Sequence, residues 1–471
     1  MAATPQVFTP ERAIDAIADF IADPVEAARF PDHRLRYRND RAAMQVGLDA
    51  LTDAQWLDHF GRFEPLSGSL PQPLALRYHG HQFRVYNPDI GDGRGFLFGQ
   101  CRDDTGRLMD FGTKGSGTTP YSRFGDGRLT LKGAVREILA TEMLEALGVP
   151  TSRTFSVVET GEQLHRGDEP SPTRSAVLVR LNHGHIRIGS FQRLATLGQT
   201  TELERLVAYS LKHYYGEEMG DDGPVRLLRH VAQRTAAMAA SFMTAGFVHG
   251  VLNSDNINIT GESFDYGPWR FAPTFDAGFT AAYFDSAGLY AFGRQAEAIH
   301  WDVVQLAIAL SEIADRDALA ASVDCFAPAY RDAIVDRMLW RLGVVPRDSA
   351  TNTALVQATE SALVASQCPL DAFFFDWRSG DLRHDRPIYA GDDFTAFRTA
   401  VAPFAPAVGT DHAYWSDAEP CTMLIGEVEE IWAQIAERDD WSALETKVAA
   451  IRRMGEAHGL PLANDKSTIS A

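Results

Sequence analysis

The sequence predicts an α+β fold in which a strand-rich part comes first and a mainly helical part follows. From residue 76 to residue 190, short runs of β-branched and aromatic residues alternate with Gly, Asp and Pro, as expected for strands joined by turns. From residue 200 to residue 340, apolar residues recur with helical spacing. Hydrophobic residues make up 45% of the 471 and charged residues 23%, which is typical of a globular protein.

The strand-rich part contains one expected helix, over 131–147. Gly148 and Pro150 follow it as stop signals. In the helical part, the apolar run over 236–248 is shorter than the roughly 20 residues of a membrane span, so we expect a buried helix there. The expected strands are RGFLFGQ (94–100), LMDFGTK (108–114), TFSVVET (154–160) and SAVLVRL (175–181).

The charge of the chain argues against two classes of partner. The chain has 44 Lys and Arg against 63 Asp and Glu, a net charge of −19. Such a field repels nucleic acids and anionic membranes, so we expect neither as a partner.

The N-terminus is acidic and amphipathic, without the basic and apolar regions of a signal peptide. The four cysteines form no C-x-x-C pair, so we expect a reducing, cytoplasmic location.

The stretch HGVLNSDNINITGESFDYG, which begins at His249, carries the strongest functional pattern. Protein kinases contain H-R-D-x-x-x-x-N followed by D-F-G, in which the first Asp accepts a proton and the Asn and second Asp hold Mg²⁺. His249, Asn256 and Asp265 fit this pattern. Val251 stands where the base belongs, but Asp255 directly precedes Asn256. The pattern predicts a site for Mg²⁺ or Mn²⁺ with the base lost or moved.

These residues also fit simple local structures. Asp255 and Asn256 are common in turns and helix caps, and Asp265-Tyr266-Gly267 is compatible with an Asx-type turn.

A glycine-rich segment, Gly91-Asp92-Gly93-Arg94-Gly95, precedes the first expected strand. Glycines allow backbone N–H groups to approach phosphate oxygens, although a plain turn between strands fits as well. Lys114 ends the next strand, and Glu137 in the expected helix is its candidate ion-pair partner. Glu142 competes for that role, but it lies about 140° further round the helix, so both glutamates cannot face the lysine.

Two further segments are rich in groups that bind anions. KGSGTTPYSRFGDGR (114–128) combines small residues with arginines just before the expected helix, which suits an anion-binding loop or a plain surface loop. Arg180 and Arg187 flank the turn NHGHI. They are candidates to clamp a triphosphate, or to form exposed salt bridges.

The order of these motifs predicts a two-lobe protein-kinase-like fold with N-terminal and C-terminal extensions. The expected parts are an N-terminal extension (1–75), an N-lobe with the nucleotide-binding loops (76–195), a helical C-lobe with the metal site (196–345) and a helical C-terminal extension (346–471).

Over roughly residues 30–310 the chain resembles the selenoprotein O family of kinase-like protein adenylyltransferases. The stretches that carry the resemblance are PLALRYHGHQF (73–83), IGDGRGFLFGQ (90–100), KGSGTTPYSRFGDGR (114–128), VREILATEMLEALGVPTSRT (135–154), HIRIGSFQ (185–192) and HGVLNSDNINITGESFDYGP (249–268).

The resemblance implies an enzyme that binds ATP in a flipped orientation and transfers AMP to a protein hydroxyl. It implies that Asp255 is the proton acceptor, that Glu137 holds Lys114, and that Asn256 and Asp265 bind Mg²⁺ or Mn²⁺. The residues implied to contact the nucleotide are Gly91, Gly93, Arg94, Lys114, Asp126, Gly127, Arg180, Arg187 and Asp265.

The chain also departs from the family pattern. Arg84 stands where the family usually has Gly, and the last residues, ANDKSTISA, lack the C-terminal cysteine or selenocysteine of many members. We therefore expect no redox control through a C-terminal thiol.

Three functions remain open at this point. The first is AMP transfer to Ser, Thr or Tyr hydroxyls of protein substrates, with UTP as a possible substitute for ATP. The second is a protein kinase in which Asp255 replaces the missing base. The third is a nucleotide-binding pseudokinase scaffold, against which the intact Lys114, Asn256 and Asp265 argue.

Overall fold

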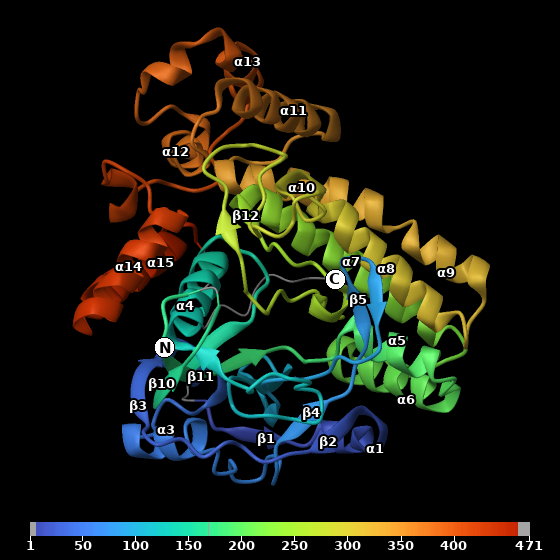
Figure 1. Cartoon of the computed structure of the whole chain (residues 1–471). Coiled ribbons are helices and arrows are strands. Elements are labelled where there is room, and N and C mark those ends of the chain that lie inside the picture. The colour runs from blue at the N-terminus through green and yellow to red at the C-terminus, as the bar shows by residue number, and fades with distance from the viewer. Residues whose placement is uncertain (1–5, 168, 460–471) are drawn as a thin grey trace.

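The computed structural model describes residues 6–167 and 169–459. It has the mixed α and β content that the sequence predicts. Strands of the first part pair in a curled antiparallel sheet, and helices form most of the remainder (Figure 1). The segment ANDKSTISA, on which the expectation about a C-terminal thiol rests, lies outside the described residues.

The sheet contains all four expected strands. Its order is β2-β4-β7-β8-β11-β10-β3, with β1 paired to β7 and β9 to β11, so strands from the first 75 residues are part of it. The strands are β1 (Thr9–Glu11), β2 (Ala22–Pro24), β3 (Arg34–Arg38), β4 (Leu74–Leu76), β7 (Leu97–Arg102), β8 (Leu108–Lys114), β9 (Leu129–Thr130), β10 (Arg153–Leu164) and β11 (Thr173–Asn182). A separate hairpin is formed by β5 (Gly80–Gln82) and β6 (Val85–Asn87).

The strand β7 begins later than the sequence pattern predicts. The carbonyl of Arg94 accepts hydrogen bonds from the backbone N–H groups of Gly115 (2.7 Å) and Ser116 (3.3 Å). These bonds fold the start of the expected strand into a loop against the end of β8, and regular pairing starts only at Leu97.

Alternation along β11 places side chains in two separate cores. Val177 and Val179 pack with the helices α2 (Asp40–Val46) and α3 (Asp53–Phe60) on one face. Ala176 and Leu178 pack on the other face, which α4 (Leu131–Ala146) covers. The helix α4 begins at the Thr130 cap and ends one residue before the expected end.

The helical part is built around α7 (Gly223–Ala245), whose buried face packs against α8 and α10. It includes most of the apolar run that the sequence marks as a buried helix. The other helices here are α1 (Ala18–Ile21) near the N-terminus, α5 (Ile188–Thr196), α6 (Thr200–Ser210), α8 (Gln295–Leu310), α9 (Arg316–Val323) and α10 (Phe326–Leu342). The short strands β12 (Phe247–Val248) and β13 (Arg270–Phe271) pair beside them.

The remaining helices form two groups. The first group, α11 (Ser349–Ser366), α12 (Leu370–Asp376) and α13 (Thr395–Val401), lies beyond α10 at the end of the molecule far from the sheet (Figure 1). The second group, α14 (Ile425–Arg438) and α15 (Ser442–Ala457), returns to α4. The pair α14–α15 lies beside α4 in Figure 1, and α15 packs on α4. Among the described helices, none has the length and apolar character that crossing a membrane requires.

The variant Phe155→Ala is expected to lower the free energy of unfolding by about 3–5 kcal/mol. Phe155 is fully buried, and its ring lies 4.8 Å from that of Trp56 and 5.2 Å from that of Phe111. Phe124→Ala makes the same change at a fully exposed ring and should alter stability by less than about 0.5 kcal/mol. Denaturant unfolding of both variants measures the difference, and equal losses would contradict this account of the core.

Candidate active site

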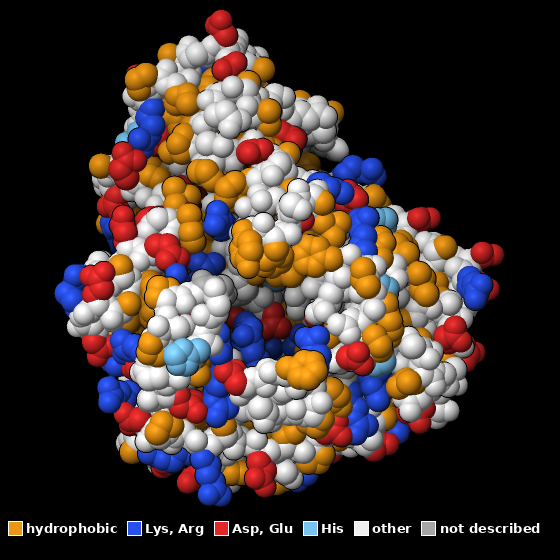
Figure 2. Space-filling view, viewed as in Figure 1, with side chains coloured by type: hydrophobic (Ala, Val, Ile, Leu, Met, Phe, Trp, Pro, Cys, Tyr) orange, Lys and Arg blue, Asp and Glu red, His pale blue; other side chains and the backbone are white. Residues whose placement is uncertain are grey.

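A cavity of about 740 Å³ lies where the sheet meets the helical part. Figure 2 shows it as a hollow in which basic and acidic side chains gather. Segments far apart in the sequence form its walls. Every site residue that the sequence suggested lines the cavity except Glu137, which lies behind Lys114.

The base of the cavity contains a buried ion pair between Lys114 and Glu137. Lys114 ends β8, and Glu137 lies in the second turn of α4; their side chains are only 8% and 2% exposed. Glu142 points elsewhere and accepts hydrogen bonds from Arg452. Of the two glutamates that the sequence left as partners for the lysine, the structure therefore pairs Glu137.

Asp265 brings three cations together. Its carboxylate lies 2.5 Å from the guanidinium of Arg180, 3.1 Å from that of Arg187 and 3.5 Å from the ammonium of Lys114. Burial alone raises the pKa of Asp265, but the charges of Arg180, Lys114 and Arg187 outweigh it and hold the pKa well below its usual value. The carboxylate is therefore ionised, and the arginines, which could have formed exposed salt bridges, are buried.

Aromatic rings hold the two arginines in place. The Arg180 guanidinium lies 5.0 Å from the ring of Phe264, and that of Arg187 lies 4.4 Å from the ring of Tyr78. Arg187 also donates to the carboxylate of Asp92 at 3.3 Å. Such stacking fixes the planes of the guanidiniums and so directs their N–H groups.

Asp255 lies on a short 3-10 turn, Ser254–Asn256, at the wall of the cavity. Its side chain is buried, and in the described part of the chain no group hydrogen-bonds its Oδ1. Burial raises the pKa of this carboxyl to about 6. A Cβ at Gly80 would lie 2.8 Å from that of Asp255, so the β5–β6 hairpin packs directly on this residue.

The oxygen donors on the cavity wall suit a magnesium ion. Among the described residues, no group of three or more His, Cys, Asp and Glu is placed to hold a metal. Mg²⁺ in nucleotide sites, however, commonly uses one or two protein oxygens together with phosphates and water. Asp265 offers a carboxylate, and Asn256 directs its amide N–H to the Val251 carbonyl (3.0 Å), which leaves the amide oxygen for another partner.

The glycine-rich segment and the 114–128 loop pack against each other above these charges. Ser122 donates its hydroxyl to the carbonyl of Gly93 at 2.5 Å. A Cβ at Gly95 would overlap the Thr113 carbonyl oxygen, and Gly127 has φ +69°. Gly95 therefore allows the close approach of two backbone segments, and Gly127 allows a left-handed backbone conformation.

Some residues of the cavity are not evident from the sequence. Asp92 lies inside the glycine-rich segment, and its position between two glycines was the only signal for its contact with Arg187. Arg166 pairs with Asp126 at 2.8 Å from a loop after β10, for which no local pattern exists. His183 and His249 lie outside the cavity lining, and a ring nitrogen of each lies within hydrogen-bond distance of a backbone carbonyl.

A family model described as protein adenylyltransferase SelO matches residues 7–389 of the chain. The chain belongs to this family. Proteins named protein nucleotidyltransferase YdiU are similar over nearly the whole length. The one from Synechocystis sp. is 41% identical over 470 residues, covering 94% of this chain and 98% of the relative. The one from Gloeobacter violaceus is 43% identical over 467 residues, covering 94% and 95%.

A more distant relative with the same name, from Pseudomonas aeruginosa, is 39% identical over 334 residues, covering 71% of this chain and 68% of the relative. The family that the sequence motifs indicated is thus confirmed, and the chain is an enzyme of the nucleotidyltransferase class.

The variant Arg187→Met should weaken ATP binding by roughly 10- to 100-fold and AMP binding far less, because a charged hydrogen bond contributes about 1.5–3 kcal/mol and AMP lacks the terminal phosphates. Isothermal titration calorimetry with both nucleotides measures this. Arg193→Met, on the adjoining helix α5 but outside the cavity lining, is the matched control. Equal losses for ATP and AMP would place Arg187 away from the terminal phosphates.

Proposed function

We propose that this enzyme transfers AMP from ATP to Ser, Thr or Tyr hydroxyls of proteins and releases pyrophosphate. The observation that carries the proposal is the set of buried cations on Asp265, with Lys114, Arg180 and Arg187 deep in the cavity. Fixed positive charge there is suited to retain the two terminal phosphates as a leaving group. A kinase must instead deliver the last phosphate to its acceptor.

We also infer a two-lobe protein-kinase-like architecture. The sheet with Lys114 and the helix with Glu137 correspond to the expected N-lobe, and the helical part with Asn256 and Asp265 to the expected C-lobe. The name of the matching family, protein adenylyltransferase, supports AMP as the transferred group.

In this reaction the acceptor hydroxyl oxygen bonds to the α-phosphorus, and the bond from that phosphorus to the oxygen bridging to the β-phosphate breaks. Asp255 takes the hydroxyl proton, since its carboxylate lines the cavity and its Oδ1 has no hydrogen-bond partner in the described part of the chain. Asn256 and Asp265 would hold Mg²⁺, which neutralises phosphate charge when bound. Lys114 and the two arginines orient the phosphates and stabilise the charge that develops on pyrophosphate.

The surroundings of the cavity suit a polypeptide acceptor. Phe83, Tyr283 and Phe284 are exposed, and their rings are neighbours, with centroids 5.9 Å apart for Phe83–Phe284 and 5.1 Å for Tyr283–Phe284. The backbone N–H of Phe83 donates to Asn253, which lines the cavity. Exposed apolar groups clustered beside a polar site are typical of protein-binding surfaces, and Figure 2 shows apolar side chains beside the hollow.

Incubation with Mg²⁺ and labelled ATP distinguishes the proposed reaction from its rivals. We expect label from the α-phosphate, and not from the γ-phosphate, to appear on protein, with a mass increase equal to AMP. Label from the γ-phosphate would identify a kinase that uses Asp255 as its base. Absence of both labels would favour the pseudokinase scaffold, and α-labelled UTP in a parallel reaction tests which nucleoside is used.

The variant Asp255→Asn should slow AMP transfer by about 10²–10⁴-fold, the usual contribution of a general base. The carboxamide keeps the size of the side chain, so ATP affinity should stay near the wild-type value. Single-turnover transfer and equilibrium ATP binding measure the two effects. Asp89→Asn, at an exposed position near the β5–β6 hairpin, is the control. Loss of ATP binding in step with activity would make Asp255 a structural or metal-binding residue.

A further inference from the structure

The helix α4 is held from two sides. On the cavity side, Glu137 pairs with Lys114, and Arg136 donates to the carbonyls of Trp269 (3.0 Å) and Gly267 (3.3 Å), just after Asp265. The helix therefore contacts both the lysine of the sheet and the segment that presents Asp265. A shift of α4 would move both.

The opposite side of α4 carries a buried carboxylate whose two oxygens both accept hydrogen bonds. Glu142 is 3% exposed and accepts from Arg452 of α15 through both oxygens, at 2.6 and 2.8 Å. The hydroxyl of Tyr37 donates to the same carboxylate at 2.5 Å and lies 3.0 Å from Arg452. Bidentate pairs of this kind combine strength with a fixed geometry.

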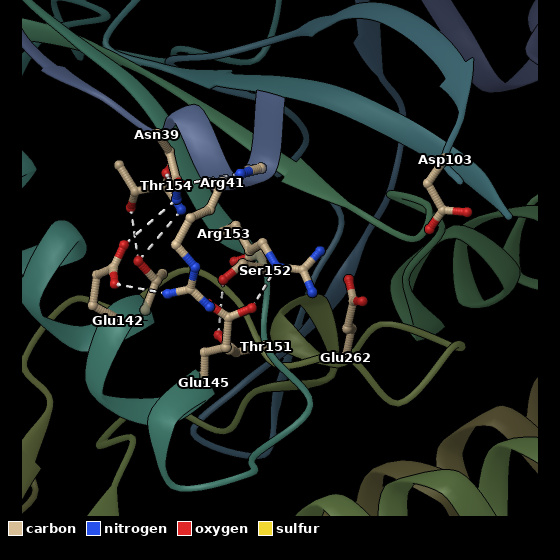
Figure 3. Close-up of polar contacts among 12 residues, drawn as sticks. Asn39, Arg41, Asp103, Glu142, Glu145, Thr151, Ser152, Arg153, Thr154 and Glu262 are labelled. Atoms are coloured by element: carbon tan, nitrogen blue, oxygen red, sulfur yellow. Dashed lines mark hydrogen bonds and ion pairs between the residues drawn. The ribbon is translucent and has the colours of Figure 1, made fainter. Parts of the chain in front are cut away.

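A second glutamate extends this attachment by one turn. Figure 3 shows Glu142 and Glu145 leaving α4 on the same side, with Arg41 close to both. Arg153 of β10 donates to Glu145 at 2.7 Å, and Arg41 lies 3.8 Å from Glu145 and 3.9 Å from Glu142. The outer side of α4 is thus tied to the sheet as well as to α15.

The α14–α15 pair is itself anchored at several points. Lys132 at the start of α4 pairs with Glu429 of α14 at 2.7 Å. A Cβ at Gly455 would lie 3.3 Å from the Cα of Ala146, so α15 approaches the end of α4 closely. Asp439, between the two helices, accepts from Arg174 of the sheet at 2.7 Å.

We propose that the α14–α15 pair is a positioning element of the active site, and that Arg452 is the positioning residue through which it acts on α4. The inference rests on the proposed function for the role of Lys114 in binding ATP. It concerns residues 425–457, beyond the residues 7–389 that the family model matches. Removing Arg452 leaves the buried carboxylate of Glu142 without its bidentate partner, which favours a shift of α4. Such a shift would weaken the ion pair between Glu137 and Lys114.

The test is a double-mutant cycle read out by ATP affinity. Arg452→Met should weaken ATP binding about tenfold, and Arg452→Lys should recover part of the loss because one donor remains. In a Glu137→Gln background the effect of Arg452→Met should disappear, because the link that transmits it is already broken. Arg453→Met is the matched control: the neighbouring arginine pairs with Asp417 and should leave ATP affinity unchanged.

Two results would overturn the inference. One is unchanged ATP affinity in Arg452→Met. The other is an equal loss with and without the Glu137→Gln change, which would show that Arg452 does not act through α4. Thermal unfolding is measured for each variant to show that it folds. If Arg452→Met does not fold, Glu142→Gln replaces it, because this change keeps the size of the side chain and removes its charge. Failure of both variants to fold would also overturn the inference and make the Glu142–Arg452 pair a purely structural one.

Because ATP affinity is measured without any transfer step, failure of the proposed AMP transfer can be distinguished from failure of the proposed role of Arg452. A protein that binds ATP normally but modifies no hydroxyl contradicts the proposed function, while the double-mutant cycle on binding still decides the role of Arg452.

Discussion

The buried charge cluster around Asp265 is the constraint on which the rest of the arrangement depends. Its cations come from β8, β11 and the residue before α5, whereas Asp265 belongs to the segment that follows the 3-10 turn of Asp255. Charges removed from water are tolerated only when they are paired and hydrogen-bonded. The cluster therefore joins the sheet to the helical part and sets the depth of the cavity between them.

The cluster is also close to electrical balance. Asp92 and Glu137 add their carboxylates to that of Asp265, facing the two arginines and Lys114. In a chain of net charge −19, pairing with buried carboxylates holds these cations at the place where an anion must bind. On the proposed function, a triphosphate competes with Asp265 for the guanidiniums and so frees its carboxylate for a divalent ion.

Much of the local structure could be predicted from the sequence, because strand alternation and helix stop signals act over a few residues. The four strands and the helix α4 were predicted in this way. Only the start of β7 was wrong, because hydrogen bonds to the Arg94 carbonyl fold this segment into a loop in place of strand pairing. The motifs that contain Lys114, Asn256 and Asp265 suggested residues that the structure brings together in one cavity. Their roles toward a nucleotide and a metal ion stay predictions.

What could not be predicted depends on contacts between distant segments. Helix periodicity showed that Glu137 and Glu142 face different ways, but not that Glu142 meets Arg452, 310 residues later. The pairing of Asp126 with Arg166, and of Asp92 with Arg187, likewise arises only when loops from different strands converge. No local pattern encodes such contacts, since the residue types involved occur equally on solvated surfaces.

The meeting of Tyr37 and Arg452 on one carboxylate joins residues 415 positions apart. A ribosome delivers the first of these long before the second, and folding begins with the parts that are delivered first. The surroundings of α4 are therefore completed only when α15 leaves the ribosome. A chain cut short by interrupted translation before α15 keeps every residue proposed to touch the nucleotide, yet lacks the outer support of the helix that aligns them. On the proposed role of Arg452, full affinity for ATP therefore requires that synthesis continue through α15.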